Sequence, residues 1–316
     1  SSIPINMQLY INIFIIRNYY NVMLILYSKY LLYHNDPNHI ENNRRLLVIK
    51  KLIKNDYKKI GRIRKDIYRY INYAHSWKYI RMIKRMWKDS YKNNRIIYLD
   101  SDTYISPLSF YSILKSVEGV LKSIEINDKY IFIPTRPPGH HVPRNPLNNN
   151  KSLGFCIFNN IAIAGMYARK RYKNVLIFDI DLHHGNGTQD VIENKKNIYY
   201  ISTHAKNIYP NTGLESENNY FNFPLDFNID DNYYIDLLKN EVFPTIEEIS
   251  PEIILVSLGF DMHKKDPLSV FNITLKSYEY IFNYLKKFNK VIYILEGGYN
   301  ERVIYNGISR LLKIYG

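Results

Sequence analysis

The sequence contains a single cysteine, Cys156, among 316 residues. One thiol excludes an internal disulfide framework and a zinc site built from several thiolates. A reducing interior compartment is therefore the simpler expectation. The chain also lacks an uncharged apolar run of about 18 residues, which argues against a transmembrane helix.

Acidic residues are scarce in the first third of the chain. Residues 1–100 contain 20 Lys and Arg but only 6 Asp and Glu, a net charge of +14, whereas residues 101–316 contain 23 of each kind. This excess is compatible with contact with nucleic acid or another anionic surface. No nucleic-acid-binding motif accompanies it, so the alternative is a solvated helical face enriched in Lys by a compositional bias.

The N-terminal residues combine two different patterns. The first 30 residues contain no Asp or Glu, a pattern loosely typical of a transit peptide. Residues 22–27, however, form an apolar run that is typical of a first core strand. We therefore expect an N-terminal extension over residues 1–21, either targeting or disordered, and one domain over residues 22–316 with a basic helical segment at about 44–95.

Apolar runs of strand length alternate with helical patterns along the chain. Hydrophobic residues make up 46% of the sequence, enough for a large core. This alternation predicts an α/β fold, a single domain with a mostly parallel β-sheet and helices on both faces. The strands are expected at 22–27, 130–133, 175–178, 198–201, 253–258 and 291–295. The helices are expected at 159–173, at 233–248 with a kink at Pro244, and at 275–287.

An unusual polar motif follows each of five expected strands. These motifs are TRPPGHH at 135–141, DIDLHHGNG at 179–187, STH at 202–204, GFD at 259–261 and EGGY at 296–299. In an open parallel sheet, ligands bind outside the carboxyl ends of the strands. The five loops are therefore expected to meet at one edge, and this convergence is stronger evidence for a site than any single motif.

Two acids and an imidazole form the expected metal site. If the chain stays extended, Asp179, Asp181 and His183 lie on one face of a strand that has a period of two residues. Asp181, His183 and Asp261 together offer one nitrogen and two carboxylates, a set that suits a catalytic zinc with open positions. A solvated acidic turn at 179–183 and an ordinary loop acid at 261 are the alternatives.

The adjacent pair His140 and His141 is suited to acid/base work near neutral pH. Asp179 is expected to orient His140, and Asn186 is expected to orient His141. Because a carboxylate raises the basicity of its partner more than an amide does, the two imidazoles are expected to differ in role.

Three aromatic residues are candidates for contact with a substrate. Tyr299 follows two glycines, which bring the backbone close to a ligand, and its phenol is suited to donate a hydrogen bond to a developing oxyanion. Phe155, after Gly154, and Tyr209 are suited to form the walls of a narrow slot for an aliphatic chain. Ordinary core packing is the alternative for all three rings.

These segments together resemble the zinc-dependent histone deacetylase family of the arginase/deacetylase superfamily. The matching pieces are RPPGHH (136–141), GFCIFNN (154–160), DIDLHHGNGTQ (179–189), YPNTG (209–213), SLGFD (257–261), DPL (266–268) and LEGGY (295–299). RPPGHH, HHGNGTQ and LEGGY are closer to the class II pattern than to class I. Asn211 and Lys265 depart from the pattern, because glycine is usual at both positions.

The resemblance implies a role for each matching residue. Asp181, His183 and Asp261 are implied zinc ligands, with Fe²⁺ an alternative metal, and His140, His141 and Tyr299 are implied catalytic residues. A structural K⁺ site is implied at Asp179, Asp181, His183 and Ser202. The implied substrate-binding residues are Gly154, Phe155, Tyr209, Leu268 and, by a weaker match, Asp102.

The family also implies a function, which is hydrolysis of N-ε-acetyl-lysine in histones or other proteins, with a role in chromatin regulation. The substrate would be an acetylated protein or peptide, and the chain would be intracellular, in the nucleus or cytoplasm, with organellar targeting left open. Two alternatives are an acetylpolyamine deacetylase and an acyl-lysine-binding scaffold of low activity. Leu268 argues against the first, because the polyamine branch has an acidic residue there. The complete catalytic set argues against the second.

Overall fold

The computed structural model describes residues 22–146 and 152–316, so the expected extension at 1–21 lies outside the described residues. The chain forms one large sheet, whose strands are β1 (Leu24–Tyr27), β2 (Lys58–Lys59), β5 (Tyr130–Ile133), β6 (Val175–Asp179), β7 (Ile198–Ala205), β8 (Tyr220–Leu225), β9 (Ile253–Leu258) and β10 (Val291–Leu295). Their order is β2-β1-β5-β10-β9-β6-β7-β8, and all neighbours are parallel. A short antiparallel pair, β3 (Ile97–Tyr98) and β4 (Tyr104–Ile105), forms a second sheet.

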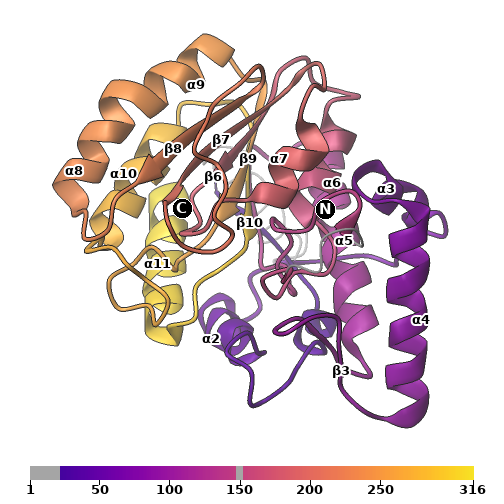
Figure 1. Ribbon diagram of the computed structural model, residues 1–316. Helices are drawn as coiled ribbons and strands as arrows, with labels where there is room; N and C mark the ends of the chain where they lie inside the picture. Colours follow the sequence, from indigo (N-terminus) through magenta and orange to yellow (C-terminus); the bar gives the residue numbers. More distant parts are fainter. Residues whose placement is uncertain (1–21, 147–151) are drawn as a thin grey trace, which may run out of the picture.

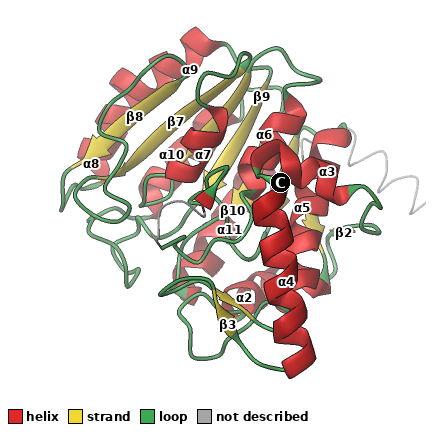
Figure 2. Ribbon diagram, turned by 45° about the vertical axis from the view of Figure 1, so that its right-hand side comes forward, coloured by secondary structure: helices red, strands yellow, loops and turns green. Residues whose placement is uncertain are grey.

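Helices cover both faces of the large sheet (Figures 1 and 2). They are α2 (Arg44–Ile53), α3 (Ile67–Ala74), α4 (Trp77–Asn93), α5 (Ser109–Glu125), α6 (Asn160–Ala168), α7 (Asn186–Ile192), α8 (Asp231–Leu237), α9 (Phe243–Ile249), α10 (Leu275–Leu285) and α11 (Glu301–Tyr315). In Figure 1, α8, α9 and α10 lie on one side of the sheet, and α4, α5 and α6 lie on the other. No helix in the described ranges is long and apolar enough to cross a membrane.

The central strands β6, β9 and β10 are buried along their whole length. Strands covered on both faces carry continuous apolar runs, and this is why all six expected strands are present at the predicted places. Strand β8 was not predicted. Its sequence YFNFPL alternates in burial and contains Pro224, which an edge strand tolerates because one side of its backbone makes no ladder bonds.

Two of the expected helical regions are divided in the structure. The basic segment at 44–95 forms three helices, α2, α3 and α4, with β2 between the first two. The helix expected at 233–248 is interrupted by a wide turn at Leu238–Val242, and Pro244 falls in the first turn of α9. Pro244 has no amide hydrogen, and the wide turn lies directly before it, where the Phe243 amide donates to the Leu238 carbonyl.

The middle of the sheet is expected to carry much of the stability of the fold. Leu255 in β9 is fully buried between β6 and β10, whereas Leu214 is 57% exposed. Leu255→Ala should lower the free energy of unfolding in urea by about 2–5 kcal/mol. Leu214→Ala is the matched control and should change it by less than about 0.5 kcal/mol. Equal losses in the two variants would contradict this description of the core.

Candidate active site

Four of the motifs stand at or directly after the ends of the neighbouring strands β5, β10, β9 and β6, whereas STH (202–204) lies within β7, which is longer than expected. Because these strands are parallel, their carboxyl ends lie along the same edge of the sheet. The expected convergence is therefore present, and the side chains described below approach one another from separate parts of the sequence.

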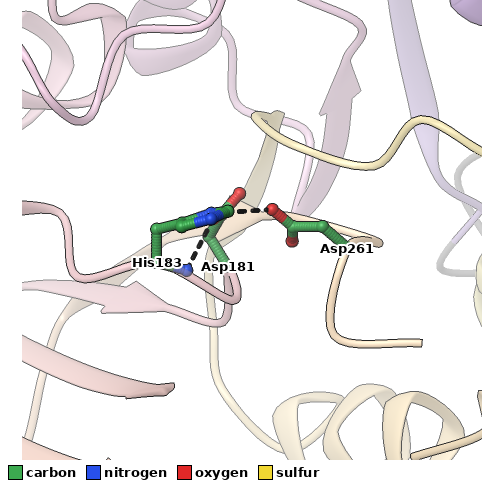
Figure 3. A group of neighbouring side chains, drawn as sticks. All are labelled: Asp181, His183 and Asp261. Carbon is green, nitrogen blue, oxygen red and sulfur yellow. Dashed lines mark hydrogen bonds and ion pairs between the residues drawn. The ribbon is translucent and has the colours of Figure 1, made fainter. Parts of the chain in front are cut away.

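Asp181, His183 and Asp261 form a compact group at this edge. One ligand atom from each lies within 4.8 Å of the others. His183 Nδ1 lies 3.2 Å from Asp181 Oδ1 and 3.2 Å from Asp261 Oδ2, so the imidazole nitrogen faces both carboxylates (Figure 3). The two acids are buried, and the His183 side chain is 15% exposed.

Strand β6 ends at Asp179, and the chain turns immediately after it. The expectation of an extended 179–183 segment was therefore wrong. Asp179 Oδ1 accepts a hydrogen bond from the Asp181 amide at 3.1 Å, and Asp181 Oδ1 accepts one from the His183 amide at 3.0 Å. Bonds from an aspartate to the amide two residues on stabilise a turn, and this turn directs Asp181 and His183 toward Asp261.

The site contains more buried acid than base. Asp179, Asp181, Asp261 and Glu296 are each at most 1% exposed. Burial, with the charge of Asp181, raises the pKa of Asp261 to about 7, and burial raises the pKa of Glu296 to about 7. Buried carboxylates are stable as anions only when positive charge compensates them, so the electrostatics favour a cation here.

Two glycines leave room for the acids to meet. A Cβ atom on Gly297 would lie 2.4 Å from Asp261 Oδ2 and 2.5 Å from Asp181 Oδ2, and one on Gly259 would lie 2.3 Å from Asp181 Oδ2. The Gly297 amide donates to Asp181 Oδ2 at 2.8 Å. The donor set, its charge and this cradle fit a divalent metal ion bound by Asp181, His183 and Asp261.

The two histidines contact different partners, as expected. His140 Nδ1 lies 3.1 Å from Asp179 Oδ2, and His141 Nδ1 lies 2.9 Å from Asn186 Oδ1. Burial alone lowers the pKa of His140, but the charges of Asp181 and Asp179 outweigh it and raise the pKa to about 10. Burial and the neighbouring imidazoles hold the pKa of His141 well below its usual range.

Aromatic rings lie next to the candidate catalytic side chains. The Tyr209 ring lies 4.9 Å from that of His141, and the Phe155 ring lies 5.6 Å from that of Tyr299, measured between centroids. Gly154 has a φ of +52°, and a Cβ atom there would lie 2.5 Å from His141 Cδ2, so glycine is required. The expected substrate-binding residues Gly154, Phe155 and Tyr209 thus lie beside the candidate catalytic side chains.

Three expected residues lie at the margin of the site. Asp102 Oδ1 accepts a hydrogen bond from Ser152 Oγ at 2.5 Å, and the Ser152 carbonyl accepts one from the Tyr209 hydroxyl at 2.7 Å. Leu268 is half-buried. Ser202 pairs with Asp179 across β6 and β7, but its Oγ lies 2.9 Å from His204 Nδ1. Its predicted role in a K⁺ site stays a prediction.

Sequence reasoning missed several residues that hold this site together. Glu296 Oε2 accepts hydrogen bonds from the amides of Gly139 at 2.7 Å and His140 at 3.3 Å. Tyr200 donates to Asp179 Oδ2 at 3.0 Å. Arg45 donates to the carbonyl of Gly298 at 2.6 Å. Glu296 stood within the EGGY motif, whereas Tyr200 and Arg45 carried no signal among the many tyrosines and basic residues of this chain.

Comparison with known proteins identifies the family and the fold of this chain. Residues 39–315 match the histone deacetylase domain. An uncharacterized protein of Methanocaldococcus jannaschii is 34% identical over 298 residues, which cover 89% of this chain and 84% of that protein. Histone deacetylase 6 of Caenorhabditis elegans is 31% identical over 73% of this chain and 25% of its own length. The crystal structure of the HDA15 HD domain has a TM-score of 0.84 at 27% identity and covers 93% of this chain and 88% of that one.

The glycine cradle provides a test of metal binding. Gly297→Ala places a methyl group against Asp181 and Asp261, so the affinity for Zn²⁺ measured by competition with a chelator should fall at least about tenfold, or 1.4 kcal/mol. Gly61→Ala is the matched control, because its Cβ meets nothing within 4 Å, and it should bind metal as the unmodified protein does. Unaltered affinity in the Gly297 variant would place the metal elsewhere.

Proposed function

The chain belongs to the histone deacetylase family, and we propose that it hydrolyses the side-chain amide of N-ε-acyl-lysine in histones or other proteins. The observation that carries the proposal is the meeting of Asp181, His183 and Asp261 beside the oriented pair His140 and His141. We propose Zn²⁺ as the metal and Fe²⁺ as the alternative, since both suit one imidazole and two carboxylates.

A divalent ion held by this group would supply an activated water and polarise the amide carbonyl. His141 is suited to accept the proton of that water at Nε2, because Asn186 Oδ1 accepts from its Nδ1 at 2.9 Å in the tautomer that leaves Nε2 free. His140, whose Nδ1 lies 3.1 Å from Asp179 Oδ2, is suited to stabilise the developing negative charge as an imidazolium. Either histidine then returns a proton to the departing lysine nitrogen, so that lysine and a carboxylate are released.

Tyr299 is proposed as the hydrogen-bond donor to the oxyanion. The Arg45 guanidinium lies 4.9 Å from the centre of the Tyr299 ring, and the Phe155 ring lies against it at 5.6 Å. Burial raises the pKa of the Tyr299 phenol far above its usual range, so the hydroxyl keeps its proton and remains a donor. A neutral, pre-oriented donor stabilises charge as it develops in the transition state.

The proposed substrate is a peptide, with the acyl-lysine side chain between Phe155 and Tyr209. Leu268 offers no charge for a polyamine, and Asp102 is the proposed contact for the substrate backbone.

An assay that compares an acetyl-lysine peptide with acetylspermidine separates protein lysine deacetylation from the small-molecule alternative. Bound metal without hydrolysis of either compound would support the scaffold alternative.

The role of Tyr299 is tested by Tyr299→Phe, which removes only the hydroxyl. Loss of one oxyanion donor should lower kcat by about 10²–10³-fold on an acetyl-lysine peptide. Metal content should stay at one ion per chain, because Tyr299 is not a ligand. Tyr305→Phe is the matched control, since Tyr305 is 40% exposed, and it should retain full turnover. Unchanged kcat in the Tyr299 variant would contradict the assigned role.

The basic first third remains a proposed contact for nucleic acid or chromatin. Helix α4 buries Tyr79, Ile80 and Ile83 and exposes a row of cations, none of which forms an ion pair within the described ranges. These cations are Lys78, Arg81, Arg85, Lys88 and Lys92.

Replacing Arg81, Arg85 and Lys88 with glutamate should weaken binding to duplex DNA at least about tenfold and reduce the salt dependence of that binding. Fluorescence anisotropy measures both quantities. A variant with glutamate at the exposed Lys195, Lys196 and Lys239 carries the same charge change outside α4 and should bind as the unmodified chain does. Equal weakening by both variants would show that net charge alone is responsible.

A further inference from the structure

One buried carboxylate joins the loop after β9 to the segment that carries Tyr299. Asp266 Oδ2 accepts hydrogen bonds from the amides of Tyr299 at 2.6 Å and Asn300 at 3.1 Å. Its other oxygen, Oδ1, accepts one from the amide of Leu268 at 3.1 Å. A further bond links the same two segments, from Asn300 Nδ2 to the Lys265 carbonyl at 2.7 Å.

Asp266 is buried and accepts its hydrogen bonds from backbone amides. The residue is 6% exposed, and no ion pair with it occurs among residues 22–146 and 152–316. Burial raises the pKa of Asp266, and the three amide donors act in the opposite direction by stabilising the carboxylate. Backbone amides from two segments therefore hold the carboxylate. The position of the carboxylate in turn fixes the backbone of both segments.

The backbone around Tyr299 is held from both sides. Arg45 Nε donates to the Gly298 carbonyl at 2.6 Å, and Asp266 receives the next two amides. Gly298 has a φ of +105°, a backbone conformation that favours glycine, directly before the tyrosine. The direction of the Tyr299 side chain depends on this short stretch of backbone, because the side chain branches from it between the two anchors.

We propose that Asp266 is a positioning residue that couples Leu268, at the rim of the substrate site, to Tyr299, the oxyanion donor. This inference rests on the proposed function. It adds that acyl-chain preference and turnover are set together, since one carboxylate fixes the backbone at both positions. Asp266 itself touches neither substrate nor metal in this account and acts only through the two segments.

The test is Asp266→Asn, which keeps the size of the side chain but replaces one acceptor oxygen with a donor. A displacement of Tyr299 by about 1 Å should lower kcat by about a hundredfold while KM for an acetyl-lysine peptide changes less than threefold. The ratio of activities on acetyl-lysine and octanoyl-lysine peptides should change as well, because Leu268 loses its anchor. Bound metal should remain at one ion per chain.

A double-mutant cycle separates positioning from general loss of stability. If Asp266 acts through Tyr299, adding Asp266→Asn to Tyr299→Phe should lower kcat less than threefold further. The matched control is Asp231→Asn, because Asp231 also accepts from a backbone amide and two hydroxyls, those of Thr274 and Ser277, at the start of α10. This control should change kcat less than twofold. Full additivity, or equal effects of the two Asn variants, would overturn the proposal.

Two further measurements keep the outcome decisive. If Asp266→Asn does not fold, Asn300→Ser keeps a helix-capping oxygen but loses the bond to Lys265, and it should lower kcat by about threefold to tenfold without changing metal content.

If the unmodified chain hydrolyses no acyl-lysine peptide, the proposed function fails. Hydrogen exchange then decides the inference, because Asp266→Asn should speed exchange at Leu268, Tyr299 and Asn300 at least tenfold and leave β9 unchanged. Unaltered exchange at these three amides would contradict it.

Discussion

Four carboxylates lie almost free of solvent around one point at the carboxyl edge of the sheet, namely those of Asp179, Asp181, Asp261 and Glu296. Such a group is stable only where cations and hydrogen-bond donors surround it, because each unpaired buried charge costs several kcal/mol. The structure provides His140, His183 and a set of backbone amides. The remaining negative charge favours a bound dication, and this requirement explains the turn after β6 and the glycines beside the acids.

The parallel sheet is what allows distant residues to meet this requirement. Four adjacent strands bring these side chains to one edge: the histidine pair follows β5, Glu296 and Tyr299 follow β10, Asp261 follows β9, and Asp179 and Asp181 stand at the end of β6. The segment Glu296–Asn300 links them all. Through Glu296 it holds the histidine loop, through Gly297 it contacts Asp181, and through Tyr299 and Asn300 it is held by Asp266. A change anywhere along this segment is therefore expected to affect both the proposed metal ligands and Tyr299, the proposed oxyanion donor.

Sequence reasoning identified those parts of the molecule whose signal lies within a few neighbouring residues of the sequence. The apolar runs gave the central strands, and the acids and histidines directly after them gave the candidate site, because both signals lie within a few residues of each other. The turn at Asp181 was not predictable, since it depends on side-chain bonds that compete with an extended strand. Arg45 was missed for a different reason, which is that it donates to a carbonyl 253 residues away. Asp266 lies in the DPL match, but its bonds to the amides of Tyr299 and Asn300, more than 30 residues away, carried no signal in the sequence. The edge strand β8 lacked a continuous apolar run.

The central claim is that one divalent ion bound by Asp181, His183 and Asp261 is required for amide hydrolysis. The most direct measurement is a titration of the metal-free protein with Zn²⁺, in which turnover of an acetyl-lysine peptide is followed at each addition. The account predicts that turnover rises in proportion to added metal and stops rising at one equivalent per chain. Full turnover in the metal-free protein, or a rise that continues well beyond one equivalent, would contradict it.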